Sequence, residues 1–335
     1  FSGVGSQRMA LRNLGVNHEV VAISEIDKFA IASYEAIHGE TYNLGDISQV
    51  ELEDIPDHDL FTYSFPCQDA SVLGRGLGLD EGSGTRSGLL WECRKIIAGK
   101  KPKYLLLENV KNLVGKKHKP NFDKWLEWLE SQGYTNYWEV LNARDYGVPQ
   151  NRERVFVVSI LGEHEPYEFP KPLELELRLK DVLEDEVDEK FYLVTDKAKE
   201  LISIITEEYD IKEKTPTDGG LKSPRPREVA NAITARYDAV ISNLQSSGTM
   251  VIEPNADGKT SKAGAVGGVG IKEEYGNDTS FRIRKLTPLE CWRLMGFSDY
   301  DFYKAEEVSS NSQLYKQAGN SIVVGVLEAI FRQLF

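Results

Sequence analysis

Two short apolar segments constrain the fold more than any other part of this sequence. Tyr104–Leu107 is uninterrupted and apolar, as expected for a strand that is buried on both faces in the middle of a parallel sheet. Leu60–Tyr63 has the same character and ends shortly before Pro66, which cannot donate to a sheet ladder. This order of strands predicts an α/β fold with a doubly wound, mostly parallel sheet. Helical patterns alternate with the strands, at residues 28–38, 88–99 and 122–132.

The length of the chain predicts one large and one small domain. Single hydrophobic cores usually stop growing at about 250–300 residues, and this chain has 335. The α/β alternation breaks down after residue 161 and resumes near Thr287-Pro288-Leu289-Glu290, which has the pattern of a capping box that starts a helix. We therefore predict a large domain made of residues 1–161 and 282–335, and a smaller domain of mixed structure at 162–281.

The composition is that of a globular protein that does not cross a membrane. Hydrophobic residues make up 41% and charged residues 28%, and no apolar run approaches the ~18 residues that span a bilayer. The three cysteines, Cys67, Cys93 and Cys291, are far apart and odd in number, which predicts neither disulfides nor a metal site and indicates a reducing compartment. Cys93 and Cys291 fall within predicted helices and are assigned to the core. The chain begins at Phe1, and we expect further residues, including a strand, ahead of it.

The distribution of charge matters more here than its total. A net charge of −13 would repel nucleic acid if it were spread evenly. Much of the excess lies in Glu163–Lys190, and basic clusters such as Arg225-Pro226-Arg227 occur elsewhere. Because a polyanion responds to the local field, the acidic total does not exclude DNA as a partner.

A glycine turn near the amino end has the character of a ligand-binding loop. Gly3 and Gly5 run into a predicted helix at residues 7–14, and glycine lets a ligand approach the backbone closely. In a dinucleotide-binding fingerprint the third glycine would fall at Arg8, whose side chain would block the usual pyrophosphate packing. The turn therefore disfavours a nicotinamide or flavin dinucleotide as the ligand.

Two acidic residues follow this turn at positions suited to a nucleoside. Glu25 comes directly after a predicted strand at 19–24, where an acid can bind a ribose diol. The alternative is that Glu25 caps the helix at 28–38, because carboxylates favour the amino ends of helices. Asp46 lies in a turn, and its carboxylate can accept a hydrogen bond from an exocyclic amine.

Cys67 and Glu108 each follow one of the two apolar strands. Ligands of open α/β sheets bind at the carboxyl ends of the strands, so a thiol and a carboxyl group there are placed for chemistry. The alternative for Cys67 is a small buried hydrophobe, the commonest role of a lone cysteine in an intracellular protein.

Two arginines lie one residue apart beside a predicted pair of strands at 136–141 and 155–160. Because side chains alternate between the two faces of a strand, Arg152 and Arg154 are expected to point the same way. Their guanidinium groups would then face an anion or a neighbouring carboxylate, or else form ordinary surface ion pairs.

The ordered motifs FSGVGS, SEID, GDIS, FPCQ, ENV, QNRER and GNS resemble those of the C5-cytosine DNA methyltransferases. The likeness covers residues 1–160 and 282–335. It implies a Rossmann-like methyltransferase fold, with residues 162–281 as the target-recognition domain. It also implies S-adenosylmethionine as cofactor, S-adenosylhomocysteine as its product, and no metal. The residues implied around the cofactor are Phe1, Gly3, Gly5, Glu25, Ile26, Asp46, Ile47, Pro66, Leu90, Asn320 and Ser321.

The resemblance further implies a covalent mechanism. Cys67 would be the nucleophile that adds to C6 of cytosine, Glu108 the acid at N3, and Arg152 and Arg154 the supports of the closed site. The target base would be flipped out of the duplex, because a stacked base offers neither face to the reacting groups. Gln68 and Ser71 are candidate contacts with double-stranded DNA. In the recognition region, Arg225, Arg227 and Arg236 are either further DNA contacts or ordinary surface residues.

These implications add up to a monomeric DNA (cytosine-5)-methyltransferase in the cytoplasm of a bacterium or phage-infected cell, linked to restriction or not. Two alternatives stay open. One branch similar to this family methylates cytosine in tRNA, but its Cys-Phe-Thr motif is absent from this sequence. The other is an inactive DNA-binding regulatory homologue, against which the presence of Cys67, Glu108 and Arg152 argues. The DNA sequence that is recognised is not predicted.

Overall fold

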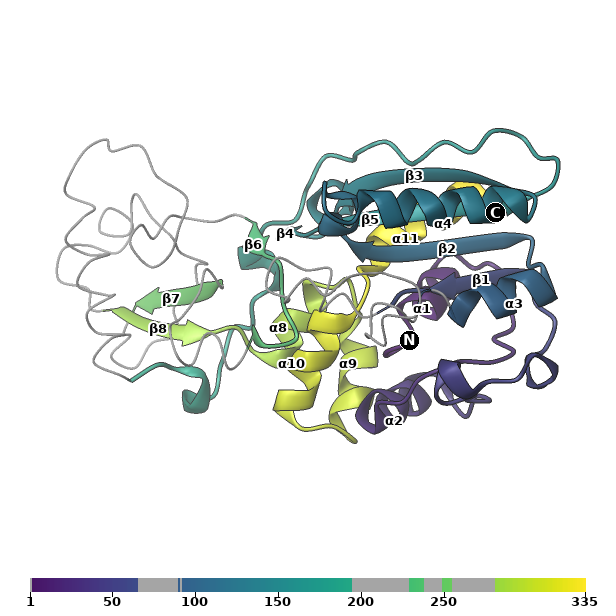
Figure 1. Ribbon diagram of the computed structural model, residues 1–335. Coiled ribbons are helices and arrows are strands. Elements are labelled where there is room, and N and C mark those ends of the chain that lie inside the picture. Colours follow the sequence, from purple (N-terminus) through teal and green to yellow (C-terminus); the bar gives the residue numbers. More distant parts are fainter. Residues whose placement is uncertain (1, 66–89, 91, 195–228, 238–248, 255–280) are drawn as a thin grey trace. The chain divides into compact units, whose positions relative to one another are not determined.

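The chain forms two compact units (Figure 1). The first comprises Phe1–Tyr146, Glu153–Pro172 and Ile322–Phe335, and the second comprises Gly147–Arg152 and Leu173–Ser321. Residues 282–321 therefore group with the second unit, although the sequence analysis placed them with the large domain. The computed structural model describes residues 2–65, 90, 92–194, 229–237, 249–254 and 281–335.

The first unit is built on a four-stranded mixed sheet with the order β1-β2-β5-β3. β1 and β2 run parallel, with Leu60 opposite Tyr104. β5 runs antiparallel to both β2 and β3, which confirms the predicted pairing of residues 136–141 with 155–160. In the described part of the sheet, β1 and β2 thus form a parallel pair, and the other two strand pairs are antiparallel. The strands are β1 (Leu60–Tyr63), β2 (Tyr104–Val110), β3 (Tyr134–Asn142) and β5 (Glu153–Leu161).

Helices cover both faces of this sheet, which explains why its central strands are continuously apolar. Figure 1 shows α4 in front of the sheet and α11 behind it. Trp125 of α4 is fully buried, and its indole nitrogen donates to the hydroxyl of Tyr63 at 3.1 Å. Cys93 is buried in the same core, as predicted. The helices of the unit are α1 (Ser6–Asn13), α2 (Lys28–His38), α3 (Cys93–Lys100), α4 (Lys119–Ser131) and α11 (Val324–Leu334), with short 3₁₀ turns at Ile47–Gln49, Leu52–Asp54, Lys111–Val114 and Ala143–Tyr146.

The strand predicted at residues 19–24 is reduced to a single parallel bridge between Ile23 and Asn43. The amide of Ile23 donates to Tyr42 at 2.9 Å, and the amide of Leu44 donates back to the carbonyl of Ile23 at 2.8 Å. The other side of the segment lines a cavity instead of a neighbouring strand. Both backbone hydrogen bonds of this bridge involve Ile23, so the pairing does not continue along the segment into a full strand.

The described part of the second unit contains short strands and the helices α8, α9 and α10. α8 opens with the predicted capping box, in which the hydroxyl of Thr287 accepts from the amide of Glu290 at 3.2 Å and the carboxylate of Glu290 accepts from the amide of Thr287 at 2.8 Å. Cys291 is buried in this helix, as predicted. The elements are β4 (Gln150–Asn151), β6 (Ala230–Asn231), β7 (Met250–Pro254), β8 (Phe281–Lys285), α8 (Pro288–Arg293), α9 (Asp299–Glu306) and α10 (Asn311–Asn320), with 3₁₀ turns at Leu179–Val182 and Glu189–Phe191.

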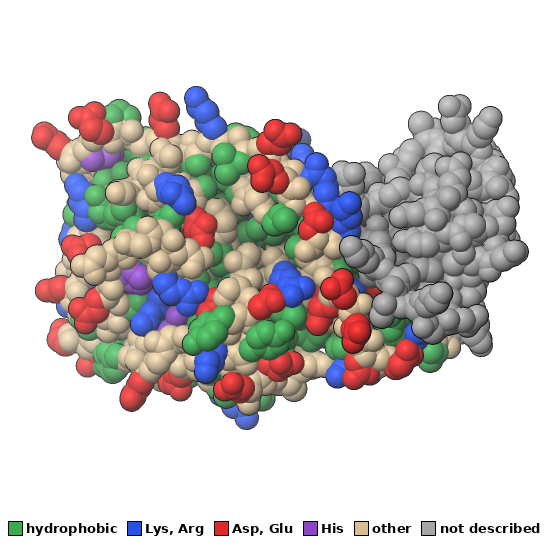
Figure 2. All heavy atoms as spheres, turned by 180° about the vertical axis from the view of Figure 1, so that it is seen from behind, with side chains coloured by type: hydrophobic (Ala, Val, Ile, Leu, Met, Phe, Trp, Pro, Cys, Tyr) green, Lys and Arg blue, Asp and Glu red, His purple; other side chains and the backbone are tan. Residues whose placement is uncertain are grey.

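The described surface carries mixed charge. Figure 2 shows acidic and basic side chains interspersed on the face seen there, rather than gathered into one acidic field. Among the helices that the structure describes, none is long and apolar enough to cross a membrane.

Candidate functional site

The glycine turn and Glu25 form one hydrogen-bonded unit. Gly3 and Gly5 adopt φ values of 55° and 86°, a region that favours glycine. One carboxylate oxygen of Glu25 accepts from the amide of Gly3 at 2.9 Å, and the other accepts from the amides of Ile26 at 2.9 Å and Asp27 at 3.0 Å. The N-cap of α2 is Asp27, which accepts from Phe29 at 3.0 Å. The Glu25 side chain therefore ties the turn to the loop before α2, and capping of the helix falls to its neighbour.

Asn43 joins this unit to the loop that carries Asp46. Its side-chain oxygen accepts from the amides of Glu25 at 3.1 Å and Gly45 at 3.0 Å, and its nitrogen donates to the carbonyl of Glu25 at 3.1 Å. The sequence analysis did not single out Asn43. The signal was an Asn two residues before a glycine in a turn, the pattern of an Asx turn.

The two carboxylate oxygens of Asp46 differ in their hydrogen bonds. One oxygen accepts from the amide of Ser48 at 3.0 Å and from its hydroxyl at 2.8 Å, and no described residue has a hydrogen bond to the other oxygen. The bond from the Ser48 amide, followed by that from its hydroxyl, lowers the pKa of Asp46. The group is therefore an anionic acceptor at neutral pH.

Three apolar residues implied around the cofactor differ in exposure. Ile26 is 70% exposed next to Glu25, whereas Ile47 is buried behind Asp46. Leu90 is 2% exposed and packs in the main core of the first unit. Only Ile26 among these three presents its side chain to solvent.

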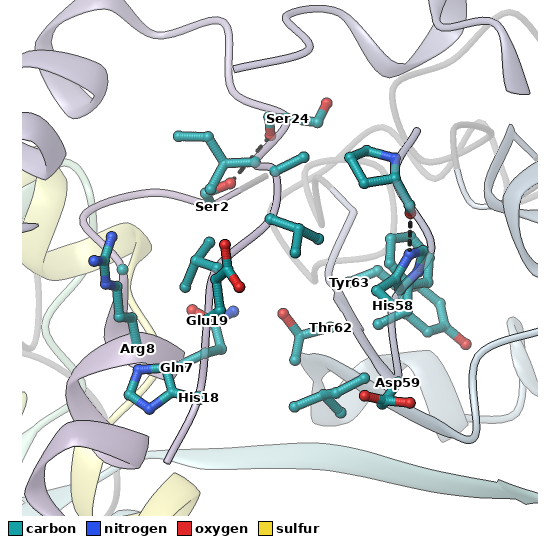
Figure 3. A pocket seen from close by; sticks show the side chains of 18 of the residues that line it. Ser2, Gln7, Arg8, His18, Glu19, Ser24, His58, Asp59, Thr62 and Tyr63 are labelled. Carbon is teal, nitrogen blue, oxygen red and sulfur yellow. Dashed lines mark hydrogen bonds between the residues drawn. The ribbon is translucent and has the colours of Figure 1, made fainter. Parts of the chain in front are cut away.

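A cavity of about 510 Å³ lies beside the glycine turn. Figure 3 shows His18 and Glu19 on one side of it and Asp59 and Thr62 on the other. The hydroxyl of Ser2 donates to the carbonyl of Ser24 at 3.4 Å at one end. Since β1 is an edge strand of the described sheet, the cavity lies along its free edge.

Glu108 lies near the carboxyl end of β2, where the sequence predicted it. Its side chain is largely buried, with 9% of the residue exposed, and Oε1 is 3.3 Å from Nε of Arg154. The guanidinium of Arg154 also donates to the carbonyl of Glu153 at 2.8 Å. The pair brings together two of the residues implied in catalysis.

Asn109 connects Glu108 to the chain that leads to Cys67. It is 2% exposed, and its side-chain nitrogen donates to the carbonyl of Phe65 at 3.1 Å while its oxygen accepts from the amide of Val110 at 2.9 Å. The sequence analysis gave this residue no role. Its position directly after Glu108, at the end of an apolar strand, was the available signal.

Arg152 and Arg154 do not point toward a common partner, contrary to expectation. Arg152 belongs to the second unit, is 4% exposed and donates to the backbone carbonyls of Ile233, Gly319 and Ser321. The reason is that the extended chain is interrupted here. The amide of Arg152 donates to the carbonyl of Gln150 at 3.1 Å, which places Arg152 in a tight turn between β4 and β5.

The other implied residues of the second unit lie at the end of α10 and in the segment 229–237. Asn320 is exposed and Ser321 is buried, with the Ser321 hydroxyl donating to the carbonyl of Gln317 at 2.7 Å. Arg236 is exposed. Several candidates lie outside the described residues, namely Phe1, Pro66, Cys67, Gln68, Ser71, Arg225 and Arg227.

Comparison with known proteins decides the family. The family model of C-5 cytosine-specific DNA methylases matches residues 1–335. The chain belongs to this family. It is 40% identical to a type II methyltransferase of Lactococcus lactis subsp. cremoris, over all of this chain and 97% of the relative. It is 33% identical to an orphan methyltransferase of Bacillus phage SPbeta, over all of this chain and 96% of that protein.

A solved structure supports the fold of this family member. The chain is similar to the DNMT2 protein of Spodoptera frugiperda with a TM-score of 0.71 and 22% identity, over all of this chain and 98% of that one. At this identity the likeness concerns the fold alone. It agrees with the α/β architecture and the Rossmann-like fold that the motifs imply.

Proposed function

We propose that this chain transfers a methyl group from S-adenosylmethionine to C5 of a flipped-out cytosine in a specific DNA sequence, through a covalent bond between Cys67 and C6. The observation that carries the proposal is the geometry at the end of β2. There Glu108 is buried and paired with Arg154, and the next residue, Asn109, holds the carbonyl of Phe65, two residues before Cys67. Because β1 and β2 are parallel neighbours, their carboxyl ends share one edge of the sheet.

The described residues fit S-adenosylmethionine. A carboxylate has about four acceptor sites, and Glu25 uses three of them on described backbone amides, which leaves room for a ribose hydroxyl. The free oxygen of Asp46 suits an exocyclic amine, and Ile26 offers an exposed apolar surface to a ring. A Cβ at Gly3 would meet no atom within 4 Å, so there is open space beside the turn. When bound, the cofactor supplies an electrophilic methyl group.

The residues of the chain supply the rest of the chemistry. Cytosine C5 is a poor nucleophile until the Cys67 thiolate adds to C6 and N3 gains a proton from Glu108, which makes the ring electron-rich at C5. After C5 carries the methyl group, its hydrogen leaves as a proton and the bond between sulfur and C6 breaks. N3 returns its proton to Glu108, and the products are 5-methylcytosine, S-adenosylhomocysteine and the regenerated Cys67 thiolate. Arg154 would hold the Glu108 carboxyl group at N3 during this sequence.

The two other cysteines are poor candidates for the nucleophile. Cys93 is 1% exposed, and burial raises the pKa of its thiol to about 12. Cys291 is fully buried. Since the thiolate is the reactive form, a buried thiol of high pKa does not add to a ring. This supports the assignment of the covalent step to Cys67.

The first test is methyl transfer itself. Labelled methyl groups from S-adenosylmethionine should appear in unmodified DNA and not in unmodified tRNA. Label in tRNA alone would favour an RNA enzyme, and label in neither would favour a regulatory homologue. Bisulfite sequencing of the methylated DNA would then identify the target sequence.

The second test isolates the covalent step. DNA that carries 5-fluorocytosine at the target should trap the enzyme, because fluorine at C5 cannot leave as a cation after the methyl group is added. The adduct should survive denaturing electrophoresis and be lost in Cys67→Ser, while Cys93→Ala and Cys291→Ala should retain it. Glu108→Gln should slow trapping greatly, because an amide cannot protonate N3. A stable adduct on Cys93 or Cys291 would refute the assignment.

A further inference from the structure

Two buried side chains of the second unit, Gln150 and Arg152, hold the backbone of one residue, Ile233, between them. The side-chain oxygen of Gln150 accepts from the amide of Ile233 at 2.9 Å. The guanidinium of Arg152 donates to the carbonyl of the same residue at 2.6 Å. With 0% and 4% exposure, the two side chains make these bonds away from solvent. Both polar groups of Ile233 are therefore fixed by the segment 150–152.

The same two side chains also hold the ends of two helices. The side-chain nitrogen of Gln150 donates to the carbonyl of Leu294, directly after α8. Nη2 of Arg152 donates to the carbonyls of Gly319 at 3.0 Å and Ser321 at 2.9 Å, at the end of α10. The last carbonyls of a helix lack partners within it and favour a cation. Arg152 supplies both a hydrogen-bond donor and a positive charge at the end of α10.

The backbones at this junction are in direct contact. A Cβ added to Gly319 would lie 2.1 Å from the amide nitrogen of Ala235 and 2.1 Å from the carbonyl carbon of Thr234. Nothing larger than glycine fits at this position without moving one of the two chains. A displacement at the end of α10 would therefore be transmitted to residues 234–235, because close-packed backbones do not compress.

We propose that Gln150 and Arg152 are positioning residues that couple the cofactor site at Asn320–Ser321 to the conformation of residues 230–237. This inference rests on the proposed function and on the family resemblance, which implies Asn320 and Ser321 as cofactor residues. The coupled segment carries Arg236, the exposed arginine implied in DNA contact, between the buried Ile233 and Tyr237. Cofactor binding would order the segment that meets the DNA, and by reciprocity DNA binding would strengthen cofactor binding.

The test is hydrogen exchange of the full chain with and without S-adenosylhomocysteine. Exchange in residues 230–237 reports local opening of the segment. On addition of the compound it should slow by about 5–150-fold, the usual range of a coupling between sites. Calorimetry on the same samples establishes whether the compound is bound.

Two variants separate coupling from stability. Arg152→Lys keeps the charge but lacks the planar fork that spans three carbonyls. Gly319→Ala retains the arginine side chain but forces the two backbones apart. Both should bind S-adenosylhomocysteine with little or no slowing of exchange in residues 230–237. The matched control is Arg293→Lys. Arg293 lies in the same unit, donates to the carbonyl of Val182 at 3.2 Å and pairs with Asp299, so its replacement should retain the slowing.

The outcomes distinguish the two proposals. If the wild-type chain does not bind S-adenosylhomocysteine, the cofactor assignment of the proposed function fails. If the compound binds but exchange in residues 230–237 is unchanged, the coupling is refuted while the proposed function stands. Retention of the slowing in both Arg152→Lys and Gly319→Ala would equally refute it. If Arg152→Lys does not fold by its thermal transition, Gly319→Ala decides.

Discussion

Asp46 offers the sharpest test of the cofactor site, because its two oxygens have separate tasks. One oxygen caps the 3₁₀ turn at Ile47–Gln49 through Ser48, and the other is proposed to accept from the adenine amine. Asp46→Asn keeps a side-chain oxygen that can cap the turn. Its amide nitrogen would face the adenine amine, and two donors cannot form a hydrogen bond. Asp46→Ala removes both oxygens. The two variants should therefore weaken cofactor binding alike but differ in stability.

The magnitude follows from the bonds that are lost. A hydrogen bond to a charged group contributes about 1.5–3 kcal/mol, and every 1.4 kcal/mol is about tenfold in Kd. Both variants should therefore raise the Kd of S-adenosylmethionine about 10- to 150-fold, as measured by calorimetry. Loss of an N-cap costs about 0.5–2 kcal/mol. Because Asp46 is near the surface, the free energy of unfolding lost in Asp46→Ala should lie at the low end of that range, and the loss in Asp46→Asn should be near zero.

Asp188 provides the matched control in the second unit. It caps the 3₁₀ turn at Glu189–Phe191 by accepting from the amide of Lys190 at 3.0 Å, and that bond likewise lowers the pKa of its carboxyl group. Asp188→Asn and Asp188→Ala should leave cofactor binding unchanged. An unaltered cofactor Kd in Asp46→Asn and Asp46→Ala would refute the assignment of Asp46 to adenine, and so would an equal loss in the Asp188 variants.

Three further results are expected. At pH 8, iodoacetamide should leave Cys93 unmodified in the native protein, as judged by mass spectrometry. The reason is that a thiol with a pKa of about 12 is ionised to only about one part in 10⁴ at this pH. Rapid labelling of Cys93 in the native protein would contradict the burial of this side chain. Because the pKa of Asp46 lies below its ordinary value, its carboxyl group stays ionised from about pH 5 to 8, and its titration should not change cofactor affinity in that range. Any contribution of the ionised carboxylate to the free energy of unfolding should be lost as the pH falls through the lowered pKa. Exchange of residues 162–281 for those of a relative should change which DNA sequence bisulfite sequencing finds methylated, without abolishing methylation; an unchanged target would place recognition elsewhere.

The parts of the fold that the sequence predicted are those with a strong local signal. The uninterrupted apolar run Tyr104–Leu107 specified β2, and the largely apolar run Leu60–Tyr63 specified β1. Thr287 with Glu290 specified the start of α8. Glu108 directly follows the run Tyr104–Leu107, and the structure places it inside β2, two residues before the end of the strand. In each case the deciding interactions lie within a few residues of one another or follow from burial on both faces of a strand.

The parts that the sequence missed depend on partners far away in the chain. Residues 19–24 have the composition of a strand, but their pairing is confined to a single bridge between Ile23 and Asn43. Arg152 has the spacing of a strand residue, but a turn between β4 and β5 directs it to carbonyls 81 to 169 residues away. Periodicity carries no information about a turn that long-range contacts stabilise, so the sequence could not separate the roles of Arg152 and Arg154.

The antiparallel direction of β5 is what allows Arg154 to reach Glu108. In an antiparallel pair the start of one strand lies beside the end of the other, and here Arg154, the second residue of β5, is opposite Val110, the last residue of β2. A parallel β5 would have begun at the opposite edge of the sheet, about six residues or roughly 20 Å from the end of β2 at about 3.3 Å per residue. A β5 strand parallel to β2 would thus have left Glu108 without this arginine. The reversed strand therefore positions the proposed catalytic pair as well as completing the sheet, and the topology, not proximity in the chain, brings Arg154 beside Glu108.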